Sequence, residues 1–132
     1  MNQIIAGIDV HKRMLMVVIG TVSGSAQEDG SEAAEPIRFA SRRFGTTTAE
    51  LLHLAGWLQQ HGVQEAVMES TAQYWKPVWL ALEQHFPLSL AQAWSNRAPR
   101  GKKNDYKDAQ RLVRRHVAGE LTLSFVPDAE QR

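Results

Sequence analysis

Cysteine is absent from the 132 residues of this chain, which excludes disulfide bonds, thiolate zinc sites and cysteine nucleophiles. Long hydrophobic runs are absent too: the longest, Met14–Ile19, has six residues, whereas a membrane-spanning helix needs about 20. The first residues lack the basic start and the cleavage site of a signal peptide. These absences suit a reducing compartment, and we expect a cytoplasmic, single-domain protein with no membrane partner.

Charge of both signs is present, but it is unevenly distributed. The chain has 15 basic and 14 acidic side chains, and the segment 97–115 alone has eight basic and two acidic ones. That segment is therefore +6 and the remainder −5. Such a segment indicates a nucleic-acid-binding face, although a solvated helix surface would give the same pattern. The eight candidate contacts are Arg97, Arg100, Lys102, Lys103, Lys107, Arg111, Arg114 and Arg115.

Short apolar runs predict five strands. The segments 3–10 and 12–20 lie close enough in the chain to form a hairpin, and neither alternates, so both should be buried on two faces. The segment 37–44 alternates and predicts a more exposed third strand. The segments 65–70 and 88–94 predict the fourth and fifth strands.

Three segments predict helices. Thr47 and Glu50 match a capping box, which begins a helix that Gly62 ends. The segment 74–86 predicts a second helix with its aromatic side chains in the core, and the segment 105–118 predicts a third. The element order is therefore β-β-β-α-β-α-β-α, which is typical of an α/β fold.

Two further segments lie outside this pattern. Residues 21–36 contain five Gly or Ser and four acids, which predicts a flexible acidic loop. Residues 121–126 are apolar, and we expect this last piece to lack a pairing partner.

Two acidic residues, Asp9 and Glu69, stand at the ends of apolar strands. A carboxylate there is costly unless it is paired or bound to a cation, and binding sites of α/β sheets gather at the carboxyl ends of strands. Asp105 and Asp108 lie on the apolar side of the third helix, although both could simply stabilise its first turn. The cations of that helix, Arg111 among them, are expected on its outer face, because each residue advances about 100°.

Four neighbouring carboxylates would repel one another, and divalent cations would relieve that repulsion. Oxygen ligands without thiolates favour Mg²⁺ or Mn²⁺ over Zn²⁺. Two such ions, roughly 3.5–4 Å apart, stabilise the attacking and leaving oxygens in phosphoryl transfer. The five histidines show no zinc spacing and are expected at the surface or in helix packing. His11 lies beside Asp9 and is the one that could instead touch a substrate.

Three motifs contain these acids: GIDVHK at 7–12, MEST at 68–71 and KNDYKDA at 103–109. In this order and spacing they resemble the amino-terminal domain of the DEDD transposases of the insertion-sequence-110 class, over most of the chain. The resemblance implies a ribonuclease-H-like, RuvC-like mixed sheet flanked by helices. It also implies a catalytic, metal-binding tetrad that holds Mg²⁺ or Mn²⁺, two ions in all: Asp9, Glu69, Asp105 and Asp108.

The same resemblance implies DNA transposition and recombination. Members of this class cleave and exchange DNA strands under the direction of a structured RNA that bridges target and donor DNA. They act as dimers or larger oligomers. The resemblance further implies a bacterial cytoplasmic protein that associates with the nucleoid when active.

The sequence departs from the family at two points. Asn104 stands where a small hydroxyl residue is usual, and Asn can cap a helix equally well. Family members also continue into a carboxyl-terminal domain with a serine nucleophile. We therefore expect residues 1–127 to be the catalytic domain, residues 128–132 to begin a linker, and the chain to be inactive alone. Ser70, beside the tetrad, should instead bond the backbone where its strand ends.

Three other functions stay open at this point. A structure-selective nuclease of the Holliday-junction type would cleave junctions by itself. A nucleic-acid-binding module would bind RNA or DNA without metal-dependent chemistry. An actin-like ATPase also begins with Gly-Ile-Asp, but it usually has a small residue after the Asp, where this chain has Val10.

Overall fold

The computed structural model describes residues 3–23, 37–92 and 104–127. Its eight elements follow one another in the predicted order. They are β1 (Gln3–Val10), β2 (Met14–Val22), β3 (Ile37–Gly45), α1 (Thr48–Gln60), β4 (Glu65–Ser70), α2 (Trp75–Leu82), β5 (Leu88–Ala91) and α3 (Asp105–Val117).

The five strands form one mixed sheet in the order β3-β2-β1-β4-β5. β1, β2 and β3 are antiparallel neighbours, whereas β4 is parallel to β1, and β5 is parallel to β4. The hairpin between β1 and β2 is closed by His11, whose backbone N–H donates to the carbonyl of Met14 at 2.9 Å. The predicted hairpin is therefore confirmed, and it places the centre of the sheet at β1.

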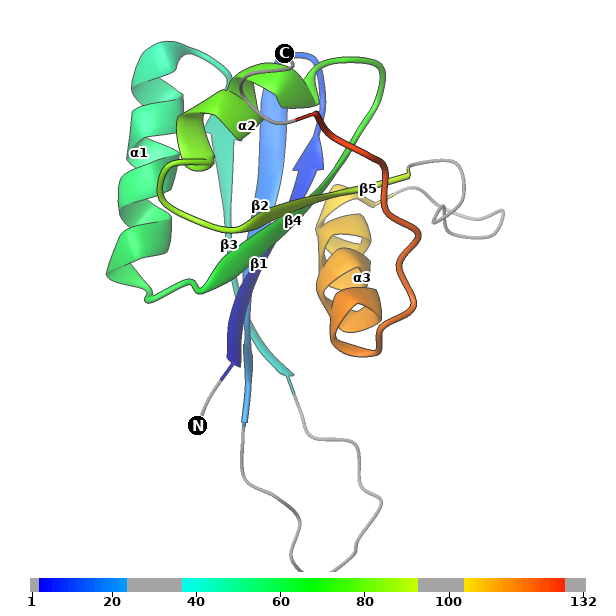
Figure 1. The fold of residues 1–132 in the computed structure, drawn as a ribbon. Coiled ribbons are helices and arrows are strands. Elements are labelled where there is room, and N and C mark those ends of the chain that lie inside the picture. Colours follow the sequence, from blue (N-terminus) through cyan, green and yellow to red (C-terminus); the bar gives the residue numbers. More distant parts are fainter. Residues whose placement is uncertain (1–2, 24–36, 93–103, 128–132) are drawn as a thin grey trace, which may run out of the picture.

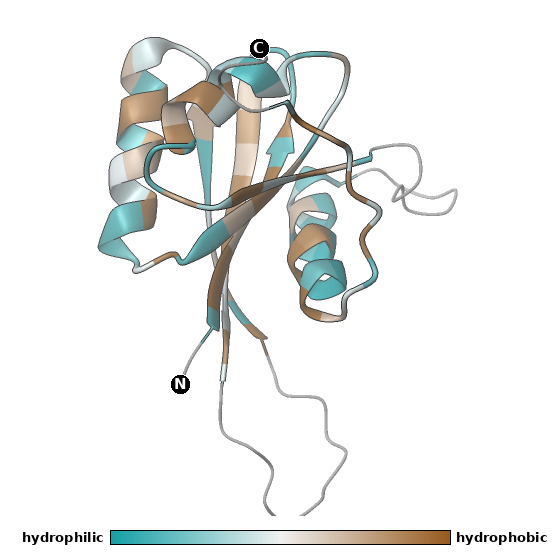
Figure 2. Cartoon of the chain, viewed as in Figure 1, coloured by the Kyte–Doolittle hydropathy of each residue, from teal (hydrophilic) through white to brown (hydrophobic). Residues whose placement is uncertain are grey.

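Helices cover both faces of the sheet. α1 and α2 lie on one face and α3 on the other (Figure 1). Residues of β1 alternate between the two cores: Ile8 and Val10 pack toward α1 and α2, and Ile5 packs toward α3. This two-sided burial explains why the sequences of β1 and β2 do not alternate, and both strands are mostly brown or pale in Figure 2.

The predicted start and end of α1 are confirmed, with one difference. Thr47 caps the helix by accepting a hydrogen bond from the N–H of Glu50 at 3.2 Å. Glu50 does not complete a capping box, because its Oε1 accepts from the N–H of Gly45 at 3.1 Å instead. Gly62 adopts φ +69 after the helix end, a conformation that favours glycine.

The second helix is shorter than predicted. α2 ends at Leu82, and the N–H groups of His85 and Phe86 then turn back to the Leu82 carbonyl at 2.9 and 3.1 Å. Phe86 is buried, and Trp75 packs edge-on against Trp79 with ring centroids 5.7 Å apart. These aromatic side chains contribute to the core, as the sequence predicts.

The expectation that residues 121–126 lack a partner is wrong. Leu123 forms an antiparallel bridge with Ala91, and the backbone of Ser124 donates to the carbonyl of Leu90 at 2.7 Å. This segment, orange to red in Figure 1, therefore runs along the edge of the sheet beside β5. Periodicity could not reveal this pairing because it is formed by only a few residues.

Parts of two predictions lie outside the described residues. The predicted acidic loop begins after residue 22, because β2 continues to Val22, and its residues 24–36 are not described. Residues 93–94 of the predicted fifth strand are not described either. Among the helices that are described, none is long and apolar enough to cross a bilayer.

Candidate functional site

The two acids at strand ends lie side by side. Asp9 on β1 and Glu69 on β4 are register partners in the parallel pair, so both side chains emerge on the same face. That face is the one covered by α3, because Val67, two residues before Glu69, packs in the α3 core. Asp9 is 6% exposed and is the one buried charged residue in the described ranges.

A glycine brings α3 close to this point. A Cβ on Gly7 would lie 2.6 Å from the carbonyl oxygen of Ala109 and 2.9 Å from Cγ2 of Val113. Real side chains do not tolerate such contacts, so β1 and α3 can approach this closely only because residue 7 has no side chain. The approach brings the first turn of α3, with Asp105, next to Asp9.

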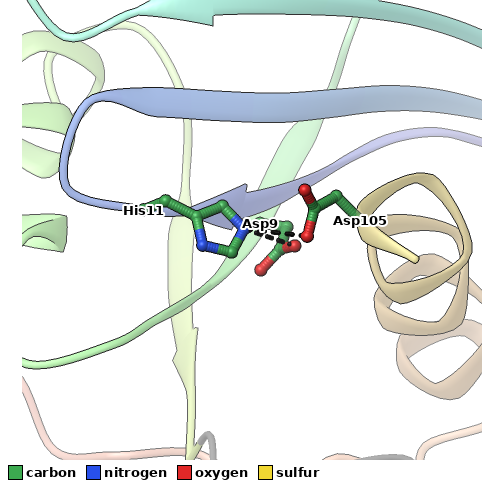
Figure 3. A group of neighbouring side chains, drawn as sticks. All are labelled: Asp9, His11 and Asp105. Carbon is green, nitrogen blue, oxygen red and sulfur yellow. Dashed lines mark hydrogen bonds and ion pairs between the residues drawn. The ribbon is translucent and has the colours of Figure 1, made fainter. Parts of the chain in front are cut away.

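The first turn of α3 is capped by Asn104, not by Asp105. The side-chain oxygen of Asn104 accepts a hydrogen bond from the N–H of Lys107 at 3.2 Å. The alternative in which Asp105 serves as the cap is therefore wrong. Its carboxylate is available for another role, and it faces the end of β1 (Figure 3).

His11 lies between two of the acids. Its Nε2 is 2.9 Å from Oδ2 of Asp9 and 3.1 Å from Oδ1 of Asp105 (Figure 3). A single imidazole nitrogen carries at most one hydrogen, so the two carboxylates share one donor. Sequence analysis did not place His11 among the site residues. Its position two residues after Asp9 could have indicated this, because residues i and i+2 of an extended chain point to the same face.

Burial raises the pKa of Asp9 above its ordinary value of 3.8. The hydrogen bond and the charge of His11 oppose this shift, while the negative charges of Asp105 and Asp108 add to it. Asp108 is therefore close enough to influence Asp9. An anionic Asp9 needs a positive partner here, and a bound cation would meet that need.

Arg111 is not on the outer face of α3, which corrects the prediction from helical periodicity. Its Nη1 lies 3.0 Å from Oδ1 of Asp108, and its Nη2 lies 3.7 Å from Oε1 of Glu69. The side chain is long enough to turn back toward the acids, and Asp108 is its neighbour three residues earlier on the helix. His11 thus contacts Asp9 and Asp105. Arg111 contacts the other two acids, Glu69 and Asp108.

The remaining predicted nucleic-acid contacts divide into described and undescribed residues. Lys107 and Arg114 are exposed on α3, and the Arg114 guanidinium stacks over the Phe39 ring at 4.9 Å. Arg115 is partly buried, and its Nη2 donates to the Glu120 carbonyl at 3.4 Å. The loop cations lie outside the described residues: Arg97, Arg100, Lys102 and Lys103.

The donor set near Asp9 fits a divalent cation. One ligand atom from each of Asp9, His11 and Asp105 lies within 4.8 Å of the others, and all three point into the same space. A cation entering there would replace the single shared hydrogen and satisfy both carboxylates. Two oxygens and one imidazole nitrogen suit Mn²⁺, and they accept Mg²⁺ less readily because it prefers oxygen ligands.

Two comparisons with known proteins show the family and the fold. A family model described as transposase, of the DEDD insertion-sequence-110 type, matches residues 6–132. No curated protein matches the sequence. Among solved structures, the RuvC of Thermus thermophilus is similar, with a TM-score of 0.59 and 14% identity over 92% of this chain and 100% of that chain. The same protein in complex with a Holliday junction substrate gives a TM-score of 0.60 at the same identity and coverage. The predicted ribonuclease-H-like fold is confirmed.

Proposed function

Since this chain belongs to the transposase family of the DEDD, insertion-sequence-110 class, we propose that it is the metal-binding domain of an enzyme that cuts and exchanges DNA strands. The observation that supports this most directly is the convergence of four acids from three elements on the α3 face of the sheet. Asp9 comes from β1, Glu69 from β4, and Asp105 and Asp108 from the first turn of α3. A fold needs no such costly cluster for its own stability.

In this proposal Asp9, His11 and Asp105 hold Mg²⁺ or Mn²⁺, and Glu69 and Asp108 complete a site for two ions. When bound, the ions stabilise charge on the scissile phosphate and on the attacking oxygen. The residues of the chain supply the positioning. β1 and β4 fix two carboxylates in register, and the approach of α3 at Gly7 fixes the other two.

DNA and a structured guide RNA are the proposed partners, and the exposed cations of α3 are the proposed contacts to their phosphates. Lys107 and Arg114 are exposed on the same helix that carries Asp105 and Asp108, so a bound phosphate backbone would pass close to the site. We also propose that the chain acts in the bacterial cytoplasm as a dimer or a larger oligomer.

A serine nucleophile is not assigned among the described residues. Ser70 adjoins Glu69, but its hydroxyl donates to the carbonyl of Thr71 at 2.9 Å, the backbone bond expected from the sequence. The hydroxyl hydrogen, which a base would have to remove in covalent catalysis, is thus engaged by the backbone. We propose that covalent strand exchange needs a serine from another domain and that Ser70→Ala changes neither metal binding nor DNA binding.

The proposal is tested by thermal unfolding with and without divalent cations. Mn²⁺ should raise the melting temperature of the wild type, because binding to the folded state alone stabilises it. Asp9→Asn should abolish that shift, while Glu120→Gln, an exposed acid outside the cluster, should keep it. An equal shift in wild type and Asp9→Asn would place the ion elsewhere and contradict the proposal.

A structure-selective nuclease is the second candidate, because the fold is shared with a protein whose structure was solved on a Holliday junction. The two candidates differ in substrate. A nuclease should cleave a four-way junction with metal alone, whereas the proposed transposase domain should leave it intact. Denaturing electrophoresis of labelled junctions separates them.

A further inference from the structure

We propose that Arg111 is a built-in counter-ion that holds Glu69 and Asp108 out of the cation pocket, so that a second divalent ion enters only when its guanidinium is displaced. This inference rests on the proposed function, since it takes the acidic cluster to be a metal site. It concerns the order in which that site is filled.

The acids are divided into two halves. In the described part of the chain, the group of ligand atoms within 4.8 Å of one another consists of Asp9, His11 and Asp105. The other two carboxylates contact Arg111, at 3.0 Å for Asp108 and 3.7 Å for Glu69. One half is thus a group of donors that could hold a divalent cation, and the other half already contacts a cation that belongs to the protein.

The Arg111 side chain is bound by two carboxylates, but its hydrogen bonding is incomplete. Its side chain is 20% exposed, and those of its partners are 13% and 18% exposed, so solvent screens these pairs less than surface pairs. The Nε atom is nevertheless buried without a hydrogen-bond partner, and the contact to Glu69 is longer than a hydrogen bond. A buried donor without a partner is unfavourable. The Arg111 guanidinium would therefore favour a binding partner that accepts hydrogen bonds from all of its N–H groups.

Charge explains why Arg111 and a second ion exclude each other. A guanidinium between Glu69 and Asp108 occupies the place where those carboxylates would coordinate metal, and a divalent cation there would repel it. With all four carboxylates ionised, one divalent ion and Arg111 together leave a net charge of −1. Two divalent ions reach neutrality without Arg111, which frees it for another anion.

A phosphate of bound nucleic acid is the anion that the geometry favours. Arginine forms paired hydrogen bonds to phosphate. Arg111 lies on α3, the helix that also carries the exposed cations Lys107 and Arg114. Nucleic acid would therefore draw Arg111 outward and open the second half of the site. The completed two-ion site would then form only on substrate.

Calorimetric titration of Mn²⁺ into the full chain tests this inference. The wild type should bind one ion well and a second one more weakly. Arg111→Gln removes the charge but keeps a polar side chain, and it should strengthen binding of the second ion by about tenfold or more. Arg38→Gln is the matched control, because it removes the same charge from an exposed position on β3, outside the proposed contacts, and both affinities should stay within about twofold of the wild type.

Several outcomes would overturn the inference. They are an equal effect of both substitutions, loss of the first ion in Arg111→Gln, or equal affinity for both ions in the wild type. If circular dichroism shows that Arg111→Gln does not fold, Arg111→Lys takes its place. A single ammonium cannot bridge both acids, so the second ion should bind about threefold more tightly, and unchanged binding would overturn the inference. If Asp9→Asn binds Mn²⁺ as the wild type does, the metal site itself is wrong, and the proposed function fails together with this inference.

Discussion

Asp9 shows at the scale of a single residue how the candidate site opposes stability. It is 6% exposed near the end of the central strand, and burial raises the pKa of its carboxyl. His11 offers one hydrogen to it and to Asp105 together, which leaves the charge only partly compensated. An uncharged side chain would serve the fold better, so we propose that the carboxylate serves binding instead.

Asp9→Asn should therefore stabilise the metal-free chain. The amide removes a poorly compensated charge and can still accept a hydrogen bond from His11. We expect the melting temperature in a chelating buffer to rise by roughly 2–6 °C, the size of a single favourable substitution in a domain of this length. Thermal unfolding followed by circular dichroism measures this, with Glu120→Gln as an exposed acid that should leave the temperature unchanged. A lower melting temperature for Asp9→Asn would mean that its charge stabilises the fold.

At the scale of the element, the residue that caps a helix determines whether a neighbouring acid is free to bind something other than the backbone. Asn104 caps α3, so the carboxylate of Asp105 is not consumed by the backbone. At α1, Thr47 caps the helix and Glu50 reaches back to the N–H of Gly45, which ties the end of β3 to the helix. That hydrogen bond is the main cause of the lowered pKa of the Glu50 carboxyl, and a weaker one from His53 adds to it.

The link at Glu50 should make stability depend on pH. Its pKa lies below the ordinary 4.5 in the folded chain, so the charged form stabilises the fold at pH values above 4.5, and this contribution is lost as the pH falls through the lowered value. Glu50→Gln should lower the melting temperature at pH 7, and the difference from the wild type should shrink as the pH falls below 4.5. Melting curves between pH 3 and 7 measure it. A difference that stays constant over this range would show that the charge of Glu50 is not involved.

Most elements could be predicted from the sequence because their signals are local. The cap at Thr47, the stop at Gly62 and the apolar strand at 65–70 all depend on a few consecutive residues. The pairing of Leu123 with β5 could not be predicted, because it depends on where a distant strand edge lies. The same limit applies to the end of α2, where the chain turns at Leu82 although the apolar pattern continues to Phe86.

The candidate site was predictable to a similar degree. Parallel strands that end in an acid bring those acids to one edge, so the proximity of Asp9 and Glu69 follows from the sequence once the strands are recognised. The position of Arg111 does not follow, because a flexible side chain chooses between solvent and the acids according to charges on other elements. His11 lies between these cases, since its spacing from Asp9 was visible but its contact with Asp105 depends on how α3 packs.

At the scale of the whole molecule, the two faces of the sheet differ in what they expose. α3 carries the acids at its start and exposed cations along its outer side, while α1 and α2 cover the opposite face (Figure 1). The domain therefore has one face on which cations and the acidic site lie on the same helix. A polyanion bound to that face would be guided to the site, whereas one bound over α1 and α2 would not.

This asymmetry predicts which lysine matters for DNA binding. Lys107 and Lys76 are both exposed and both on helices, but Lys107 lies on α3 and Lys76 on α2, across the sheet. Each phosphate contact that is lost should reduce the slope of log affinity against log salt by about 0.9. Lys107→Ala should therefore flatten the slope by about that amount, and Lys76→Ala should leave it unchanged, as measured by fluorescence anisotropy with duplex DNA at several salt concentrations. Equal slopes for the two variants would mean that DNA does not approach over α3, and the cations of that helix would then be an ordinary solvated surface.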